Sequence, residues 1–189
     1  LFTSGTTAKP KAVMISHIYT YMSGMSQTLS MTRGLEHEQD LRLGTFTPMT
    51  FHIGDQIMMF SSLMAGGTII MGRKPDAKVM ARACSEERIT SLFGGSPQFI
   101  ENLIRECHEN PGTYDLSTIT SMFYGWAPLD PKSLKAFEAL TRPNLVCWLL
   151  IGQTECLACH QFFVSRNRQL FEATSPTVNY VGVPVPLLA

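Results

Sequence analysis

Short apolar runs alternate with longer amphipathic segments along most of this chain. Apolar runs bounded by Gly, Pro or polar residues are typical of buried strands, whereas apolar residues that recur with the helical period are typical of helices. The runs that predict strands span 42–46, 68–71, 89–93, 118–124 and 145–151. The segments that predict helices span 17–33, 56–65, 76–84, 97–108 and 131–140. This alternation predicts an α/β fold, with a mostly parallel sheet flanked by helices.

Local signals add detail to two of the predicted helices. Ser16 is placed to cap the first helix, in which Tyr21, Met25 and Leu29 follow helical spacing. The segment 56–65 carries no charge and is apolar almost all round, which predicts a buried helix.

The opening stretch, residues 1–15, combines two short apolar runs, which predict strands, with a loop that has almost no side chain large enough to pack. Ordering such a loop costs conformational entropy, which a bound polyphosphate would offset. Backbone N–H groups, hydroxyls and lysines are the donors and charges that phosphate oxygens need. No Gly-Lys-Ser/Thr precedes a helix, so this is not a Walker A loop, and a solvated polar hairpin is the alternative. The candidate phosphate-binding residues are Thr3, Ser4, Gly5, Thr6, Thr7, Lys9 and Lys11.

Three further loops, at His52 onward, 125–128 and 152–155, each follow a predicted strand. In parallel sheets the binding loops gather at the carboxyl ends of the strands, so we expect these three to lie together. Each also has a plainer interpretation, namely a structural histidine, an ordinary strand-to-helix turn and a solvated carboxylate.

Five segments carry a family resemblance. Residues 1–15 resemble the phosphate-binding signature Thr-Ser-Gly-Thr-Thr-Gly-x-Pro-Lys-Gly of adenylate-forming (AMP-binding) enzymes, the superfamily of acyl-CoA synthetases, luciferases and peptide-synthetase adenylation domains. Residues 48–54, 125–129, 151–155 and 180–186 are similar to the family's acyl-pocket, Gly-Gly-Ala-Pro-Leu, Tyr-Gly-x-Thr-Glu and Val-Gly-x-Pro-x-Pro segments, in the same order. The resemblance implies that residues 1–189 are part of the N-terminal domain of an acyl-CoA-synthetase-like fold, without its upstream part and its C-terminal domain.

The resemblance also implies an activity. A carboxylic acid, fatty or other acyl, would attack ATP to give an acyl-adenylate and pyrophosphate, and coenzyme A would then accept the acyl group as a thioester. Thr154 would orient the α-phosphate as a catalytic residue, and Glu155 would be catalytic and hold Mg²⁺. We expect the fragment alone to be inactive. The implied nucleotide and acyl pocket consists of His52, Gly125, Trp126, Ala127, Pro128, Ile151, Gly152 and Gln153.

Several positions depart from the family pattern. Ala8 and Ala12 stand where the family has glycines, and Ile151 stands where it has an aromatic residue that stacks on adenine. Trp126 replaces a glycine, which predicts a shortened or reshaped acyl pocket. His52 stands where amino-acid-activating members have an Asp, which favours acids that lack an α-amine. These departures also motivate the alternative that the protein is a non-catalytic nucleotide-binding homologue.

A competing motif overlaps the last loop. Cys156, Cys159 and His160 match the c-type haem attachment pattern, and a cysteine pair is also compatible with zinc. No second pair has ligand spacing, and the motif directly follows a predicted core strand, so a haem or metal centre is the minor alternative. We interpret the five cysteines as reduced thiols in a cytoplasmic protein.

Charge and composition narrow the choice of partners. Lys plus Arg and Asp plus Glu both number 15, so no nucleic acid or anionic membrane is implied as a partner. Charged residues make up 16% of the chain, below the roughly 25% usual for soluble domains, which predicts that further protein covers part of this surface. No apolar stretch has the length of a transmembrane segment, and any targeting signal is expected outside the 189 residues.

Overall fold

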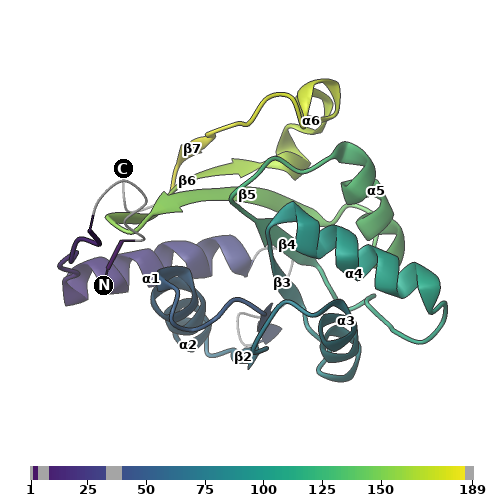
Figure 1. Cartoon of the computed structure of the whole chain (residues 1–189), viewed down its shortest axis with the longest axis horizontal. Coiled ribbons are helices and arrows are strands. Elements are labelled where there is room, and N and C mark those ends of the chain that lie inside the picture. Colours follow the sequence, from purple (N-terminus) through teal and green to yellow (C-terminus); the bar gives the residue numbers. More distant parts are fainter. Residues whose placement is uncertain (1, 4–8, 33–39, 186–189) are drawn as a thin grey trace.

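A computed structural model describes residues 2–3, 9–32 and 40–185 of the chain. Within these residues, seven strands form one sheet in the order β2-β1-β3-β4-β5-β6-β7 (Figure 1). The strands from β2 to β5 run parallel to one another, whereas β6 and β7 add antiparallel strands. The predicted mostly parallel sheet flanked by helices is therefore confirmed. The strands are β1 (Arg42–Thr45), β2 (Thr68–Met71), β3 (Ser91–Gly95), β4 (Ser121–Tyr124), β5 (Val146–Gln153), β6 (Cys156–Phe163) and β7 (Val183–Pro184).

Helices cover both faces of this sheet (Figure 1). One face carries α1 (His17–Met31) and α2 (Phe60–Met64). The other face carries α3 (Ala77–Glu86), α4 (Pro97–Glu109), α5 (Pro131–Leu140) and, after a 3-10 turn, α6 (Arg168–Thr174). In the described part of the chain, no helix is both long and apolar enough to span a membrane.

Alternate residues of the central strands face two separate cores. Leu92 of β3 pairs with Met122 of β4, and both belong to the core on the α3–α5 face. Their neighbours Phe93 and Phe123 also pair, and both belong to the core on the α1–α2 face. Phe123 stacks on Trp148 of β5, with ring centroids 4.8 Å apart. Because both faces of these strands are buried, their sequences are continuous apolar runs, which is why the runs could be recognised.

Helix caps explain why two helices begin where predicted. The Ser16 hydroxyl accepts a hydrogen bond from the N–H of Tyr19 at 3.1 Å, and α1 follows directly. The Asp130 carboxylate accepts from the N–H of Lys132 at 2.7 Å, and α5 has the predicted bounds. Strand β2 also has the predicted bounds, and most other predicted elements differ by a few residues at their ends.

The prediction of a buried helix at 56–65 is right in that most positions are buried or half-buried, and wrong about where the helix begins. The helical segment begins earlier, as a π-helix over Ile53–Met59, and continues as α2. Ile57 and Met58 are fully buried, as are Ser61 and Ser62, whereas Leu63 is 62% exposed. The two serine hydroxyls donate to backbone carbonyls one turn earlier, so they satisfy their hydrogen bonds inside the helix.

The apolar stripe of α1 is not its packing face either. Tyr21 and Leu29 are 51% and 49% exposed, and the buried side of α1 is mostly polar. The Thr28 hydroxyl donates to a backbone carbonyl of α2 at 3.0 Å. The Ser30 hydroxyl donates to the side-chain oxygen of Gln161 in β6, also at 3.0 Å. Helical period therefore identified α1 correctly, but packing against distant segments decides which side is buried, with hydrogen bonds from Thr28 and Ser30 as part of it.

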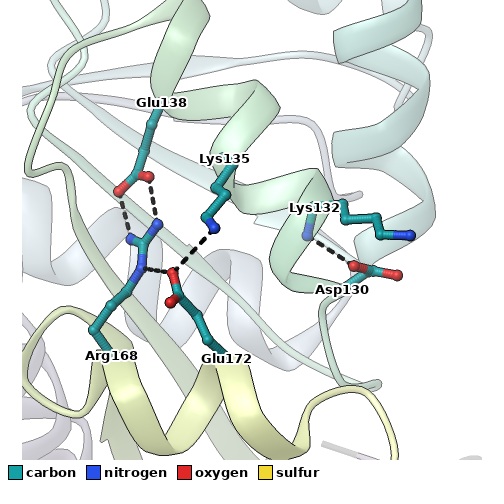
Figure 2. Close-up of polar contacts among 6 residues, drawn as sticks. All are labelled: Asp130, Lys132, Lys135, Glu138, Arg168 and Glu172. Atoms are coloured by element: carbon teal, nitrogen blue, oxygen red, sulfur yellow. Dashed lines mark hydrogen bonds and ion pairs between the residues drawn. The ribbon is translucent and has the colours of Figure 1, made fainter.

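Sequence patterns did not identify β6 or α6. Helix α6 is attached to α5 by a network of ion pairs (Figure 2). Arg168 forms two hydrogen bonds of 2.7 Å with the carboxylate of Glu138, and its Nε donates to Glu172 at 2.8 Å. Lys135 lies 3.7 Å from the same oxygen of Glu172. This network holds α6, which follows β6, against α5 on the face of the sheet that also carries α3 and α4.

Candidate functional site

Loops at three strand ends meet around a cavity of about 560 Å³. These are the loops predicted to gather at the carboxyl edge of the parallel strands. The loop after β1 contributes Thr50, Phe51, His52 and Ile53 to the cavity wall, and the turn after β4 contributes Gly125 and Trp126. The end of β5 and its turn contribute Leu149, Leu150, Ile151, Gly152 and Thr154.

The loop after β1 reaches the cavity at the start of the π-helix. The N–H of Phe51 donates to the carbonyl of Pro48 at 2.9 Å, and the N–H of Gly54 donates to the carbonyl of Phe51 at 2.8 Å. These turns place the half-buried His52 directly before the π-helix and against the cavity. π-helical turns are rare overall, but many of those known occur at functional sites. The π-helix therefore supports the interpretation of this loop as part of a site.

Trp126 occupies a backbone conformation that usually belongs to glycine. Its φ is +67°, and the N–H of Ala127 donates to the carbonyl of Gly125 at 2.9 Å. An i to i+2 hydrogen bond around a residue with positive φ describes a strained three-residue turn. The Trp126 ring meets Phe93 edge-on, with centroids 5.7 Å apart, although 60% of Trp126 remains exposed. Backbone strain that holds a large aromatic ring at a cavity wall is typical of functional sites.

The turn between β5 and β6 carries the two predicted catalytic residues. Thr154 is half-buried and lines the cavity, whereas Glu155 is exposed beside it. Gln153, at the end of β5, is also exposed and lies outside the cavity wall, as do Ala127 and Pro128. Of the predicted pocket residues, the structure therefore brings together His52, Gly125, Trp126, Ile151 and Gly152.

The two ends of the opening loop lie close together. Phe2 forms an antiparallel bridge with Ala12, and the N–H of Thr3 donates to the carbonyl of Lys11 at 3.0 Å. Phe2 lines the cavity, and Lys9 and Lys11 are exposed. Ala12 has no positive φ, so a glycine is not required there. Two predicted strands are reduced to this single bridge, and Ser4, Gly5, Thr6, Thr7 and Ala8 lie outside the described residues.

The cavity wall is apolar, with a few polar groups. Four aromatic rings contribute to it, those of Phe2, Phe51, Phe93 and Trp126. No carboxylate, lysine or arginine is found among the described residues of the wall. A wall of this kind suits a flat or apolar ligand.

A protein-only metal site is not formed by the described residues, because no three His, Cys, Asp or Glu side chains gather there. Magnesium does not need such a cluster. It keeps several waters and is commonly bound through one or two carboxylates together with substrate phosphates. The exposed carboxylate of Glu155, which directly follows Thr154 in the sequence, fits that type of site.

Some cavity residues were not singled out from the sequence. Phe93 and Leu149 were interpreted only as parts of core strands, and their position at the carboxyl ends of those strands was the available signal. Asn179 is exposed and lines the cavity only because the chain returns to it after α6. Nothing in the local sequence around Asn179 indicates this placement.

Curated relatives match most of the chain at modest identity. A 2-succinylbenzoate–CoA ligase of Arabidopsis thaliana is 28% identical over 194 aligned positions, which cover 98% of this chain and 33% of the relative. The 4-coumarate–CoA ligase-like 9 protein of the same plant is 26% identical over 73% of this chain and 24% of the relative. Tyrocidine synthase 3 of Brevibacillus parabrevis is 29% identical over 92% of this chain and 2% of its own length. The chain thus spans about a third or less of these relatives.

Solved structures show the same fold. The O-succinylbenzoate coenzyme A synthetase of Bacillus subtilis, in complex with ATP and magnesium ion, has a TM-score of 0.73 and 19% identity, over 98% of this chain and 35% of that one. A luciferase-like enzyme from the mealworm Zophobas morio has a TM-score of 0.72 and 23% identity, over 98% of this chain and 40% of that one.

A family model matches the chain as well, in agreement with the fold and the relatives. The pattern of the AMP-binding enzymes matches residues 1–189, which is the whole chain. The chain therefore belongs to the AMP-binding enzyme family.

Proposed function

We propose that this chain forms the nucleotide- and acid-binding part of a ligase that activates a carboxylic acid with ATP. One observation carries the proposal. The loop that begins at His52, the turn at Gly125 and Trp126, and the turn at Thr154 converge on one cavity, and the exposed Glu155 directly follows Thr154 in the sequence. An apolar wall beside hydroxyl, lysine and carboxylate groups provides for both an acyl or adenine group and a polyphosphate.

An apolar part for the acyl or adenine group and polar groups for the polyphosphate suit a reaction between an acid and ATP. A carboxylate oxygen of the acid attacks the α-phosphorus of ATP, the bond to the β-phosphate breaks, and pyrophosphate leaves. The acyl-adenylate then transfers its acyl group to the thiol of coenzyme A, with release of AMP. Because the reacting groups are all anionic, they repel each other until donors and cations offset their charge. Most of the catalytic effect is therefore electrostatic and positional.

Individual residues have distinct roles in this proposal. Thr154 donates its hydroxyl hydrogen to the α-phosphate, and Glu155 holds Mg²⁺. Bound Mg²⁺ would neutralise phosphate charge. The opening loop, Thr3 to Lys11, binds the β- and γ-phosphates. Ile151 packs against the base.

The class of acid follows from the wall of the cavity. An α-ammonium group needs a carboxylate partner, and the described wall residues include none. The residue at position 52 of this wall is the half-buried His52, which is not a carboxylate. We therefore propose acids that lack an α-amine, fatty or aromatic, as the substrates.

Nucleotide binding by the chain itself tests the first part. Calorimetric titration with ATP and Mg²⁺ should give weak but measurable binding. Glu155→Gln should weaken that binding about tenfold, as expected when a metal-binding carboxylate is lost. Glu109→Gln, which changes an exposed carboxylate on α4, is the matched control and should bind as the parent does. Equal binding by all three proteins would contradict the role of Glu155.

Turnover tests the second part. The 2-succinylbenzoate–CoA ligase of Arabidopsis thaliana is about three times as long as this chain, so we expect acid-dependent pyrophosphate release from the full-length protein and none from the 189 residues alone. Pyrophosphate release at comparable rates from the 189 residues would overturn the second expectation.

The strained, substituted turn at Trp126 favours one alternative, a non-catalytic nucleotide-binding homologue. Magnesium-dependent ATP binding by the full-length protein, without pyrophosphate release for any acid in a broad panel, would support this alternative and refute the ligase.

A further inference from the structure

Two of the five cysteines differ from the rest in their exposure. Cys84, Cys107 and Cys147 are buried, whereas Cys156 and Cys159 are half-exposed at the start of β6. All five are free thiols. The half-exposed pair belongs to the Cys-x-x-Cys-His motif that the proposed function leaves without a role.

An irregularity in the β5–β6 ladder brings these two thiols together. Gln153 of β5 pairs with Cys156, and Ile151 pairs with His160. The two-residue step from Ile151 to Gln153 in β5 thus faces a four-residue step from Cys156 to His160 in β6, so β6 carries a bulge within the stretch that contains both cysteines. In a regular strand, residues three positions apart point to opposite faces, and the bulge removes that separation.

Side-chain interactions agree with this placement. The Cys156 thiol interacts with the Cys159 thiol and with the Tyr19 hydroxyl of α1. The Cys159 thiol also donates to the carbonyl of Ile151, at a sulfur–oxygen distance of 3.4 Å. Two thiols that are in contact and partly open to solvent need little rearrangement to become a disulfide.

We propose that Cys156 and Cys159 form a reversible intramolecular disulfide when a small oxidised disulfide, such as oxidised glutathione, is present. One cysteine thiolate attacks a sulfur of the oxidant, which releases one glutathione thiolate and leaves a mixed disulfide on the protein. The second cysteine then attacks the protein sulfur of that mixed disulfide and releases the second glutathione. Two protein thiols lose two electrons and two protons in total, and one glutathione disulfide becomes two thiols.

The bond would change the neighbouring turn. A disulfide holds its sulfurs about 2 Å apart, much closer than two thiols in contact. Closing that distance pulls Cys159 toward Cys156 and takes its sulfur away from the Ile151 carbonyl. Both ends of the Thr154–Glu155 turn would then move, because the turn lies between Ile151 and Cys156. Oxidation should therefore weaken ATP binding, a consequence that rests on the proposed function.

The buried cysteines provide an internal comparison. Cys84 and Cys107 also lie near each other, but burial raises their thiol pKa values to about 12 and about 11. Burial also raises the pKa of the Cys156 thiol, so access to the oxidant is what separates the two groups. The buried thiols are shielded from the oxidant and should stay reduced under the same conditions.

Peptide mapping of the native protein tests the disulfide directly. The protein is incubated at pH 8 with excess oxidised glutathione, its remaining thiols are alkylated after denaturation, and the peptides are analysed by tandem mass spectrometry. We expect one bond, between Cys156 and Cys159, that dithiothreitol removes, and alkylation of the three buried cysteines. Alkylation of both Cys156 and Cys159, or stable separate glutathione adducts on each, would overturn the proposal.

Variants separate the two parts of the inference. Cys156→Ser and Cys159→Ser should each stop at a glutathione adduct on the remaining thiol, whereas Cys107→Ala should still form the bond. In the parent, oxidation should raise the Kd for ATP about fivefold or more, and dithiothreitol should restore it. An unchanged Kd despite a mapped disulfide would refute the effect on the turn. Absence of ATP binding by the reduced parent would refute the proposed function and leave the disulfide standing.

Discussion

The guanidinium of Arg168 and the carboxylate of Glu138 face each other through two parallel hydrogen bonds of 2.7 Å (Figure 2). The side chain of Glu138 is only 15% exposed, and the pair joins α6 to α5. Paired hydrogen bonds between an arginine and a carboxylate are among the stronger polar contacts in proteins. We therefore expect this contact to contribute measurably to stability.

Arg168→Ala should lower the free energy of unfolding by about 1–3 kcal/mol, because it leaves a poorly exposed carboxylate without its partner. Lys135→Ala is the matched control, because Lys135 is 64% exposed and lies 3.7 Å from Glu172. It should change stability by less than about 1 kcal/mol. Urea unfolding at neutral pH measures both. If both variants lose the same free energy of unfolding, the two parallel hydrogen bonds contribute no more than a single exposed ion pair.

The same network makes stability depend on acid. The hydrogen bond from Arg168 lowers the pKa of Glu172 below its ordinary value, with the nearby charges of Lys135 and Arg168 adding to the effect. A carboxyl whose pKa is lower in the folded state stabilises the protein above its unfolded pKa, and this contribution disappears as the pH falls through the folded pKa. The urea midpoints of the parent and Glu172→Gln should therefore differ at pH 7, and the difference should shrink as the pH falls below the ordinary pKa of a glutamate. A difference that stays constant with pH would contradict this assignment.

Trp126 allows strain and pocket shape to be tested together. Trp126→Gly relieves a positive φ but loses the edge-on contact with Phe93, so the two effects should offset and leave stability within about 1 kcal/mol of the parent. In the full-length protein this variant should accept a broader range of acids, because the ring no longer occupies the wall. Asn144→Gly, at an exposed residue with φ +61°, relieves strain without touching the cavity. If Trp126→Gly accepts the same range of acids as the parent, Trp126 does not shape the acid-binding part of the cavity.

Gly182 and Gly112 separate a steric clash from backbone strain. Both have positive φ, but a Cβ at Gly182 would lie 2.1 Å from the carbonyl oxygen of Gln161, whereas Gly112 has no atom within 4 Å. Gly112→Ala should cost about 1 kcal/mol, from strain alone. Gly182→Ala should cost more, or should detach β7 from β6.

Hydrogen exchange distinguishes these two outcomes at Gly182. The N–H of Val185 donates to the carbonyl of Cys159 at 3.1 Å, so detachment of β7 should speed its exchange while the central strands stay protected. Equal stability of the two glycine variants, with unchanged exchange at Val185, would contradict the close approach of the Gly182 backbone to β6.

Local patterns in the sequence predicted much of this fold. The runs that became β3, β4 and β5 are apolar because both faces of these strands are buried, and Asp130 followed by Pro131 marks the start of α5. The loops that follow β1, β4 and β5 could be grouped in advance, because the carboxyl ends of parallel strands share one edge. The roles of the residues on those loops remain predictions.

The sequence by itself determined the alternation of strands and helices, several helix starts and the family, since these depend on residue period, caps and short motifs. The tertiary structure decided the antiparallel direction of β6, the polar packing face of α1, the π-helix before α2 and the contact between Cys156 and Cys159. Each of these depends on partners distant in the sequence, such as Gln161 for Ser30 or the β5 ladder for the bulge in β6. A local pattern records which conformations a segment favours, but the register and direction of its contacts are set only when the distant segments pack together.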